Sequence, residues 1–131
     1  MSYQWVLPSI LSAIHQAQLI EHGGDTGVRD EGLLASALAR PQNLLAYGEP
    51  EPDIAALAAS YAYGICKNHP FVDGNKRVAY VTARTLLLRN GHDIKATREE
   101  KVYVMLSLAS GDLTEAQLAE WFRQKLVSAD A

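Results

Sequence analysis

Residues 69–77 read HPFVDGNKR and separate two strongly apolar segments of the chain, residues 53–67 and 78–88. Each apolar segment is long enough for a helix, and its composition predicts a helix that is buried on most sides. The turn between them holds a histidine, a carboxylate and two cations. Because uncompensated buried charge costs several kcal/mol, we expect these groups to be satisfied by one another, by water or by a ligand.

Outward from this turn, apolar and polar runs alternate without the period-two pattern of strands, and Gly, Pro and Asp residues separate them. The pattern predicts an all-α fold of about six helices. A chain of 131 residues, 48% of them hydrophobic, is long enough for one core and too short for two ordinary domains. We therefore expect a single domain over residues 1–131.

Local signals set the expected helix boundaries. The first helix is expected from Pro8 to His22 with a stop at Gly23-Gly24, and the second from the cap Asp30 to Pro41. The third is expected from the cap Asp53 to Lys67, and the fourth from Gly74 or Asn75 to a stop at Asn90-Gly91. Two more are expected to begin at the capping boxes of Thr97 with Glu100 and of Thr114 with Gln117. Apolar residues predicted for the core faces of these helices include Leu11, Ile14, Leu19, Ile20, Leu33, Leu34, Ala37, Leu38, Val81, Leu88, Val102, Val104, Leu106, Leu108, Leu118, Trp121, Phe122 and Leu126.

Two segments are expected to be irregular. Residues 41–52 are rich in proline and also hold glycine and asparagine, which is typical of an exposed loop. A substrate-docking flap and a plain connector remain open for this segment. Residues 128–131 are expected to form a frayed tail.

The overall composition narrows the class of protein. The formal net charge is −3 and the pI about 5.7, so the field of the whole molecule does not favour nucleic acid or anionic membranes as partners. Residues 1–7 lack a basic start and a long apolar run, and no segment approaches about 20 apolar residues. The sequence therefore predicts a cytoplasmic protein without a membrane segment. Cys66 is the only cysteine and lies in an apolar stretch, which predicts a buried structural thiol rather than a nucleophile.

The turn at residues 69–77 has the features of an anion site. If the following helix begins near Gly74 or Asn75, its free backbone N–H groups and the positive end of its dipole face the turn. Lys76 and Arg77 would then oppose that dipole. A bound phosphate chain would remove this conflict, so the turn is predicted to hold a polyphosphate. The alternative is a plain connection between two helices, with incidental charges.

Further residues of the turn acquire roles from this prediction. Histidine changes charge near neutral pH, so His69 at the mouth of the site can take a proton from an attacking hydroxyl. Asp73 can hold a magnesium ion together with phosphate oxygens. Phe71 is expected to anchor the turn in the core.

The same stretch resembles the signature loop of the Fic/Doc superfamily, whose wider pattern is H-P-F-x-[DE]-G-N-G-R-x-x-R. Two departures matter, because Lys76 stands where the wider pattern has a second glycine and Tyr80 where it has a second arginine. The Asn-Lys-Arg form is that of Doc-type toxins. The resemblance also covers Ile14-His15, Gly23-Gly24, Gly27, Arg29-Asp30, residues 33–41 and residues 88–91, which together span most of the chain.

The resemblance implies the Fic/Doc fold and the activity of Doc-type toxins, which use ATP and Mg²⁺ as protein kinases on a threonine of translation elongation factor Tu and so inhibit translation. In the implied site, His69 is the general base and Asp73 is the orienting and magnesium-binding carboxylate. Gly74 and Asn75 form the anion nest. Lys76 and Arg77 clamp phosphate oxygens and stabilise transition-state charge, and Lys67 is a further phosphate contact.

Doc-type toxins are restrained in trans by an antitoxin that folds onto the toxin, so the resemblance implies such a partner. The self-inhibitory segment [S/T]-x-x-x-E-[G/N] of Fic proteins does not occur in this sequence. Three other functions remain open: a Fic-type transferase of AMP, a non-catalytic module that binds phosphate or a partner, and a nuclease-type toxin. Lys76 and Tyr80 weigh against AMP transfer, and the negative net charge weighs against a nuclease.

Four remaining side chains carry weaker predictions. His15 is expected to be packed and hydrogen-bonded, and His22 and His92 to be exposed beside turn glycines. Arg84 lies two turns beyond Arg77 and is expected to contact the antitoxin or only water.

Overall fold

The computed structural model describes residues 2–130, and these form six α-helices and two short strands. In chain order the elements are α1 (Pro8–His22), α2 (Glu31–Tyr47), α3 (Ile54–Asn68), α4 (Asn75–Arg89), β1 (His92–Ile94), α5 (Arg98–Ser110), α6 (Glu115–Lys125) and β2 (Leu126–Ser128). The all-α fold predicted from the sequence is confirmed, with a strand pair added. Within the described residues, no helix combines the length and hydropathy that a membrane span needs.

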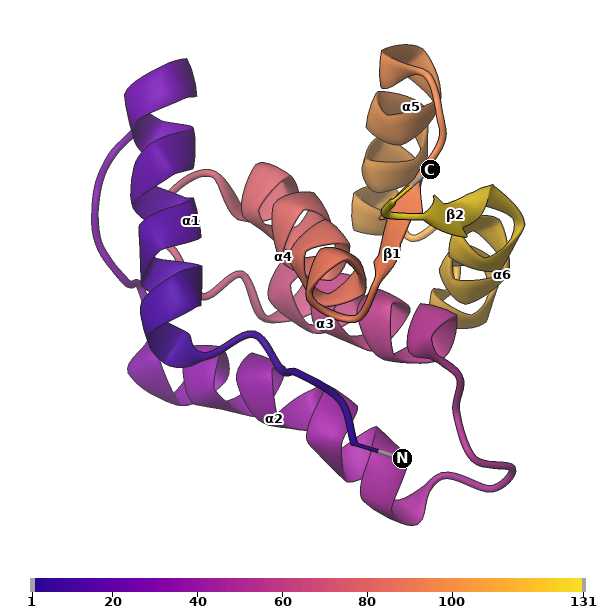
Figure 1. The fold of residues 1–131 in the computed structure, drawn as a ribbon. Coiled ribbons are helices and arrows are strands. Elements are labelled where there is room, and N and C mark those ends of the chain that lie inside the picture. Colours follow the sequence, from indigo (N-terminus) through magenta and orange to yellow (C-terminus); the bar gives the residue numbers. More distant parts are fainter. Residues whose placement is uncertain (1, 131) are drawn as a thin grey trace.

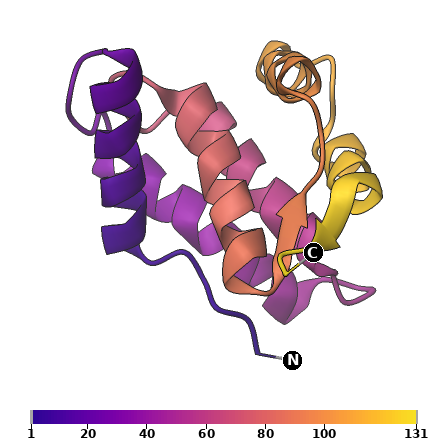
Figure 2. The ribbon, with the colours of Figure 1, turned by 45° about the horizontal axis from the view of Figure 1, so that its top comes forward.

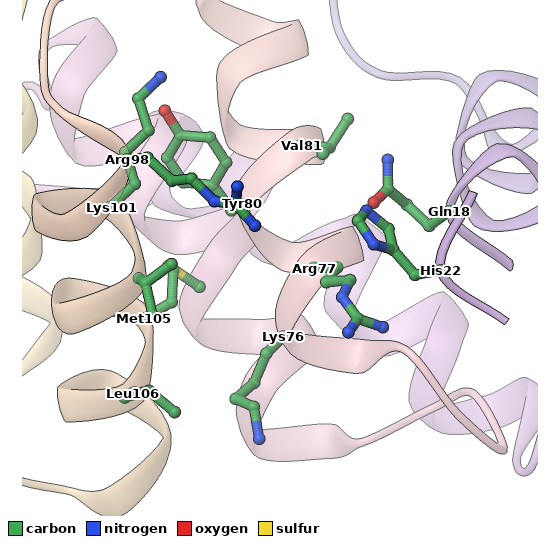
Figure 3. Close-up of a pocket in the computed structure, with 11 residues that line it drawn as sticks. Gln18, His22, Lys76, Arg77, Tyr80, Val81, Arg98, Lys101, Met105 and Leu106 are labelled. Carbon is green, nitrogen blue, oxygen red and sulfur yellow. The ribbon is translucent and has the colours of Figure 1, made fainter. Parts of the chain in front are cut away.

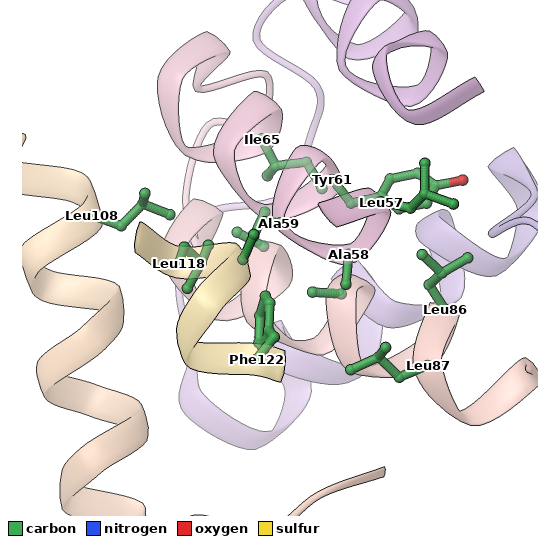
Figure 4. Packing of buried hydrophobic residues seen from close by; sticks show 14 of the residues in the cluster. Leu57, Ala58, Ala59, Tyr61, Ile65, Leu86, Leu87, Leu108, Leu118 and Phe122 are labelled. Carbon is green, nitrogen blue, oxygen red and sulfur yellow. The ribbon is translucent and has the colours of Figure 1, made fainter. Parts of the chain in front are cut away.

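The helix α3 forms the centre of the molecule. It packs against α2, α4 and α6, and Figures 1 and 2 show α4 lying beside it, between α1 and α5. Figure 4 shows the side chains of α3 meeting those of α4 and α6. The buried residues of α3 are Ile54, Ala55, Leu57, Ala58, Ala59, Ser60, Tyr61, Ala62, Gly64 and Ile65. Burying one Leu or Ile side chain contributes about 1.5–3 kcal/mol. Burial of this many side chains therefore holds α3 firmly in the core, and with it the turn that follows α3.

The local capping signals predicted most helix boundaries correctly. The side chains of Asp30 and Asp53 accept hydrogen bonds from the first turns of α2 and α3. Both capping boxes are formed, at Thr97 with Glu100 and at Thr114 with Gln117. These are short-range interactions, so the sequence specifies them without reference to the rest of the fold.

The predicted end of α2 at Pro41 is wrong, because the helix continues to Tyr47. A proline inside a helix costs about 3 kcal/mol through the lost hydrogen bond and the clash of its ring. Tertiary packing offsets this cost, since Pro41 is buried and Leu44 and Leu45 pack against the core. The preceding Arg40 is also held, by hydrogen bonds from its guanidinium to Ser60 and Glu115.

The irregular segment expected at 41–52 is therefore reduced to residues 48–53. This segment precedes the N-terminus of α3, whereas the 69–74 turn follows its C-terminus. Fifteen residues of helix, about 22 Å at 1.5 Å per residue, separate the two. That distance favours the connector over the substrate-docking flap.

The C-terminal segment is not a frayed tail. Leu126–Ser128 pairs antiparallel with His92–Ile94, and the Ala129 N–H donates to the Gly91 carbonyl at 3.1 Å. The two paired segments lie far apart in the sequence, and each is too short to show the alternation of apolar and polar residues that marks a strand. No local pattern therefore predicts this pairing. His92 is consequently half-buried instead of exposed. Ala131, the last residue of the predicted tail, lies outside the described residues.

Some residues predicted for core faces are exposed instead, namely Ile20, Leu88, Val102 and Leu106. On α5 only a narrow stripe of Val104, Met105 and Leu108 is buried. The helix meets α3, α4 and α6 along this stripe, so the rest of its surface stays open. The apolar side chains of Val102 and Leu106, each about half exposed at 51% and 52%, line a groove described below.

Candidate active site

The turn predicted at residues 69–77 joins α3 to α4 and is bounded by two residues with left-handed backbone. His69 follows α3 with φ 50° and ψ 54°, and Gly74 precedes α4 with φ 80°. Glycine adopts this conformation at little cost, whereas a side chain makes it unfavourable for histidine. The N-terminus of α4 begins at Asn75, as the sequence predicted.

A cavity of about 290 Å³ lies in this turn and is lined by His69, Asp73, Gly74, Asn75, Lys76 and Arg77. The structure thus brings together every residue predicted for the site except Lys67. No side chain caps α4 and no acidic residue lies in its first turn. The first N–H groups of a helix have no partner within it, so the cavity combines such donors with two cations, as a phosphate-binding site requires.

The side chain of Asn75 fixes the turn and is 4% exposed. Its amide oxygen accepts from the Phe71 N–H and its amide nitrogen donates to the Phe71 carbonyl, both at 3.0 Å. Both ends of the amide are therefore occupied. What Asn75 can offer an anion is its main-chain N–H.

The carboxylate of Asp73 is exposed, and backbone donors orient it. Its Oδ1 accepts from the Gly74 N–H at 2.9 Å, and its Oδ2 accepts a longer contact from the Asp25 N–H at 3.4 Å. Gly24 has φ 121°, which is strained for a residue with a side chain, and a β-carbon there would lie 2.9 Å from that Oδ2 and displace the carboxylate. Residues 24 and 25 thus help to aim the carboxylate, a role that sequence reasoning missed.

The residues present fit a magnesium ion only if a substrate supplies part of its coordination. Carboxylate oxygens are suitable ligands for magnesium, and Asp73 supplies them. Within residues 2–130, no group of three His, Cys, Asp or Glu side chains is placed to hold a metal. This arrangement suits an ion shared between one carboxylate and phosphate oxygens.

Phe71 and His15 anchor the middle of the turn. Phe71 is 2% exposed, and its ring stacks on the His15 imidazole with a centroid distance of 3.9 Å. The His15 Nε2 lies 3.1 Å from the Asp73 carbonyl oxygen, within hydrogen-bond distance. The predictions of a buried Phe71 and a packed, hydrogen-bonded His15 are confirmed.

The segment between α1 and α2 also holds the turn in place. Val28 forms a bridge with Phe71, and the Val72 N–H donates to the Gly27 carbonyl at 3.1 Å. The Arg29 side chain donates to the carbonyls of Asn68 and His69. Arg29 belonged to the sequence resemblance, but nothing in the sequence indicated this contact, which joins residues 40 positions apart.

A second hollow, of about 380 Å³, adjoins the first because Lys76 and Arg77 line both. Figure 3 shows side chains of α1, α4 and α5 facing this groove. Its wall is apolar at Val81, Val102, Met105 and Leu106, and four cations with no carboxylate surround it: Lys76, Arg77, Arg98 and Lys101. His22, exposed as predicted, lies at its edge on α1.

Tyr80 lies in the same groove, at the position that departs from the wider Fic pattern. Burial raises the pKa of its phenol to about 12. Its hydroxyl is buried without a hydrogen-bond partner among the described residues. A neutral phenol cannot act as a phosphate clamp in the manner of an arginine.

Lys67 does not line the cavity. It is exposed on the last turn of α3, and its Nζ lies 5.7 Å from the ring centroid of Tyr63. Neighbouring Cys66 is half-buried, and burial raises the pKa of its thiol to about 11. The thiol is therefore protonated near neutral pH, consistent with the prediction that it is no nucleophile.

Arg84 has a partner within the chain, so the expectation that it contacts only water is wrong, and its contact with an antitoxin stays a prediction. It donates to both carboxylate oxygens of Asp93, at 2.9 and 3.1 Å. The hydrogen bond from Arg84 lowers the pKa of Asp93. This ion pair joins α4 to β1.

Comparisons with known proteins show which family this chain resembles. The model of the Fic/DOC family matches residues 5–87. The chain is 30% identical over 125 residues to "Protein kinase doc" of Escherichia phage P1. This match covers 95% of this chain and 98% of the relative. It is 42% identical over 77 residues to "Toxin Doc" of Mycolicibacterium smegmatis (strain ATCC 700084 / mc(2)155), a match that covers 59% of each chain.

Proposed function

Because the chain belongs to the Fic/DOC family, we propose that it is a Doc-like toxin that transfers the γ-phosphate of ATP to a serine or threonine hydroxyl of a protein. We further propose elongation factor Tu as the target and inhibition of translation as the result. The observation that carries the proposal is the cavity at the uncapped N-terminus of α4, which His69, Asp73 and two cations line. Similarity to a relative named as a protein kinase supports phosphoryl transfer.

His69 acts as the general base. The target hydroxyl gives its proton to the His69 imidazole while its oxygen forms a bond to the γ-phosphorus, and the bond from that phosphorus to the bridging oxygen breaks to release ADP. His69 is exposed on the cavity wall, so an incoming hydroxyl can reach it. A positioned base of this kind contributes about 10²- to 10⁴-fold to the rate.

The N-terminus of α4 stabilises the charge that develops on the transferred phosphate. The N–H groups of its first turn and the side chains of Lys76 and Arg77 supply donors on one wall of the cavity. Removing one such donor typically costs about 10²- to 10³-fold in rate. Asp73 would hold a magnesium ion against the phosphate oxygens, and this ion would neutralise part of their charge.

Two positions favour phosphoryl transfer over transfer of AMP. Lys76 narrows the turn where Fic nucleotidyl transferases have glycine, and its side chain lines both the cavity and the groove. Tyr80 replaces the arginine that would hold inner phosphates, and its phenol is neutral. Both features support a nucleotide that presents its terminal phosphate to His69.

A protein antitoxin is the proposed partner. The support is similarity to a relative named as a toxin and the lack of a self-inhibitory segment in this sequence. The test is growth arrest when the chain is expressed alone, relieved when the product of a neighbouring small reading frame is co-expressed and co-purifies with the chain.

Intact-mass spectrometry of elongation factor Tu, incubated with this protein, magnesium and ATP, tests the reaction. A gain of about 80 Da that His69→Ala abolishes is the expected result. A gain of about 329 Da would show AMP transfer instead. No gain would contradict elongation factor Tu as the target, and equal effects of the wild type and His69→Ala in cells would favour the non-catalytic module.

A further inference from the structure

His69 adopts a backbone conformation that its own sequence disfavours. With φ 50° and ψ 54°, it is the one non-glycine residue with positive φ within residues 2–130. The left-handed region is unfavourable for residues with a side chain. Pro70 adds to the conflict, because the residue before a proline prefers extended backbone. Contacts with the rest of the fold must therefore hold His69 in place.

Arg29 supplies those contacts through three consecutive carbonyl groups. Its Nε donates to the His69 carbonyl at 2.7 Å, and its Nη2 donates to the Asn68 carbonyl at 2.8 Å. Its main-chain N–H donates to the Pro70 carbonyl at 2.7 Å. The last carbonyls of a helix lack partners within it and carry the negative end of its dipole, so a guanidinium is well matched to this position.

The two side-chain bonds select the conformation of His69. In an extended chain, successive carbonyl groups point to opposite sides, so one planar guanidinium could not reach both. With His69 left-handed, the carbonyls of Asn68 and His69 both accept from Arg29. The fork of the guanidinium thus favours the observed turn over the extended alternative.

Arg29 approaches the turn from a segment that is itself fixed. The neighbouring Val28 pairs with Phe71, and Asp30 caps α2 by accepting from the Leu33 N–H at 2.9 Å. Asn68 closes the arrangement by donating from its side chain to the Leu33 carbonyl at 2.9 Å. Among the ion pairs of residues 2–130, none involves Arg29.

We infer that Arg29 is a positioning residue that sets the imidazole of His69 at the cavity by holding its backbone left-handed. Arg29 does not line the cavity, whereas His69 does, so Arg29 acts through His69 and not on the substrate. The consequence for catalysis rests on the proposed function. The conformational effect does not depend on it.

The test compares Arg29→Met with the matched control Arg84→Met, in which a guanidinium that also makes two hydrogen bonds, to Asp93, is removed. In NMR spectra, the amide–Hα coupling and Cα shift of His69 report its φ. We expect these signals to change in Arg29→Met and to stay unchanged in Arg84→Met. We expect kcat for phosphoryl transfer to fall about 10- to 100-fold in Arg29→Met, with KM for ATP altered less than about 2-fold, as for misplacement of a catalytic group.

Unchanged His69 signals in Arg29→Met overturn the inference, whatever the kinetics show, and so does a changed signal with an unchanged kcat. If the His69 signals change but the wild type transfers no phosphate, the positioning role stands and the proposed function fails. Arg29→Lys keeps the charge without the fork, and intermediate changes are expected. If Arg29→Met does not fold, this second variant decides the question by the same readouts.

Discussion

The N-termini of α4 and α5 use opposite chemistry at the same kind of structural position. At α5, Thr97 and Glu100 form a closed capping box, and Glu99 and Glu100 complement the helix dipole. At α4, the cap is Gly74 without a side-chain hydrogen bond, no acid lies in the first turn, and Lys76 and Arg77 oppose the dipole. The first arrangement stabilises a helix, whereas the second leaves donors and positive charge available to an anion.

If the N-terminus of α4 binds phosphate as proposed, the same features that allow binding make this helix end less stable. An optimised cap and an acidic first turn would fill the cavity and repel phosphate. Substitutions at the two helix ends should consequently move stability and activity in different directions.

The largest effect is expected at the base beside the α4 terminus. His69→Ala should lower phosphoryl transfer about 10²- to 10⁴-fold, because the general base is lost. Thermal unfolding should change little, since His69 is exposed. Steady-state kinetics and calorimetry measure the two, with His92→Ala, in the β1–β2 pair, as the control that keeps activity. Activity near wild type in His69→Ala would remove the histidine from the mechanism.

Placing an acidic residue in the first turn of α4, as in α5, should change the affinity for ATP and the stability of the fold in opposite directions. Lys76→Glu should weaken ATP binding at least about 10-fold, because a phosphate clamp becomes a repelling charge. It should also raise the free energy of unfolding by about 0.3–1 kcal/mol, because an acid in the first turn complements the dipole. Isothermal titration and urea denaturation report the two quantities. A variant that loses both affinity and stability would argue that α4 does not hold an open anion site.

The opposite experiment removes the N-terminal cap of α5, which should lower stability without affecting activity. Thr97→Ala removes the capping hydroxyl, which accepts from the Glu100 N–H at 3.1 Å, and should lower the free energy of unfolding by about 1 kcal/mol. Phosphoryl transfer should stay within about 2-fold of wild type, because this end of α5 carries no reacting group. Urea denaturation and kinetics at one temperature provide the check. A large loss of activity without a loss of stability would contradict the division between the two helix ends.

The smallest effect concerns pH and the cap of α3. The hydrogen bond from Arg123, at 2.6 Å, lowers the pKa of Asp53 below its ordinary value of 3.8. A lowered folded pKa gives stability that is present above pH 3.8 and is lost as pH falls through the folded value. Asp53→Asn should cost up to about 1 kcal/mol at pH 6, since the pair is half exposed.

Urea denaturation of wild type and Asp53→Asn at pH 6 and at pH 3 tests this dependence. The difference between the two proteins should be smaller at pH 3, because below pH 3.8 the Asp53 carboxyl of the unfolded chain is largely protonated and the stabilisation from its lowered folded pKa is reduced. A difference that grows at pH 3 would show that the sign is wrong.

Much of the fold was predictable because its signals are local. Asp53, Thr97 and Thr114 marked helix starts correctly, and the apolar composition of residues 54–65 predicted the central helix. The errors arose where distant segments meet. Pro41 stays helical because its neighbours pack on α3, and residues 126–128 become a strand because residues 92–94 lie beside them.

The candidate site divides in the same way. His69, Asp73, Gly74, Lys76 and Arg77 lie within nine consecutive positions, so their spacing alone is enough to group them. The family resemblance added Lys67, which precedes this stretch by two residues, yet its side chain lies over Tyr63 and outside the cavity. Nearness in sequence does not determine the direction of a side chain on a helix.

The sequence by itself determined the helical class, the caps and the turn that carries the charged residues, because each depends on neighbours within about four positions. Only the tertiary structure decided how that turn is held. His15 on α1 and Arg29 before α2 reach it from 58 and 40 positions away. Such contacts form when separate helices pack, and their geometry depends on all the helices at once.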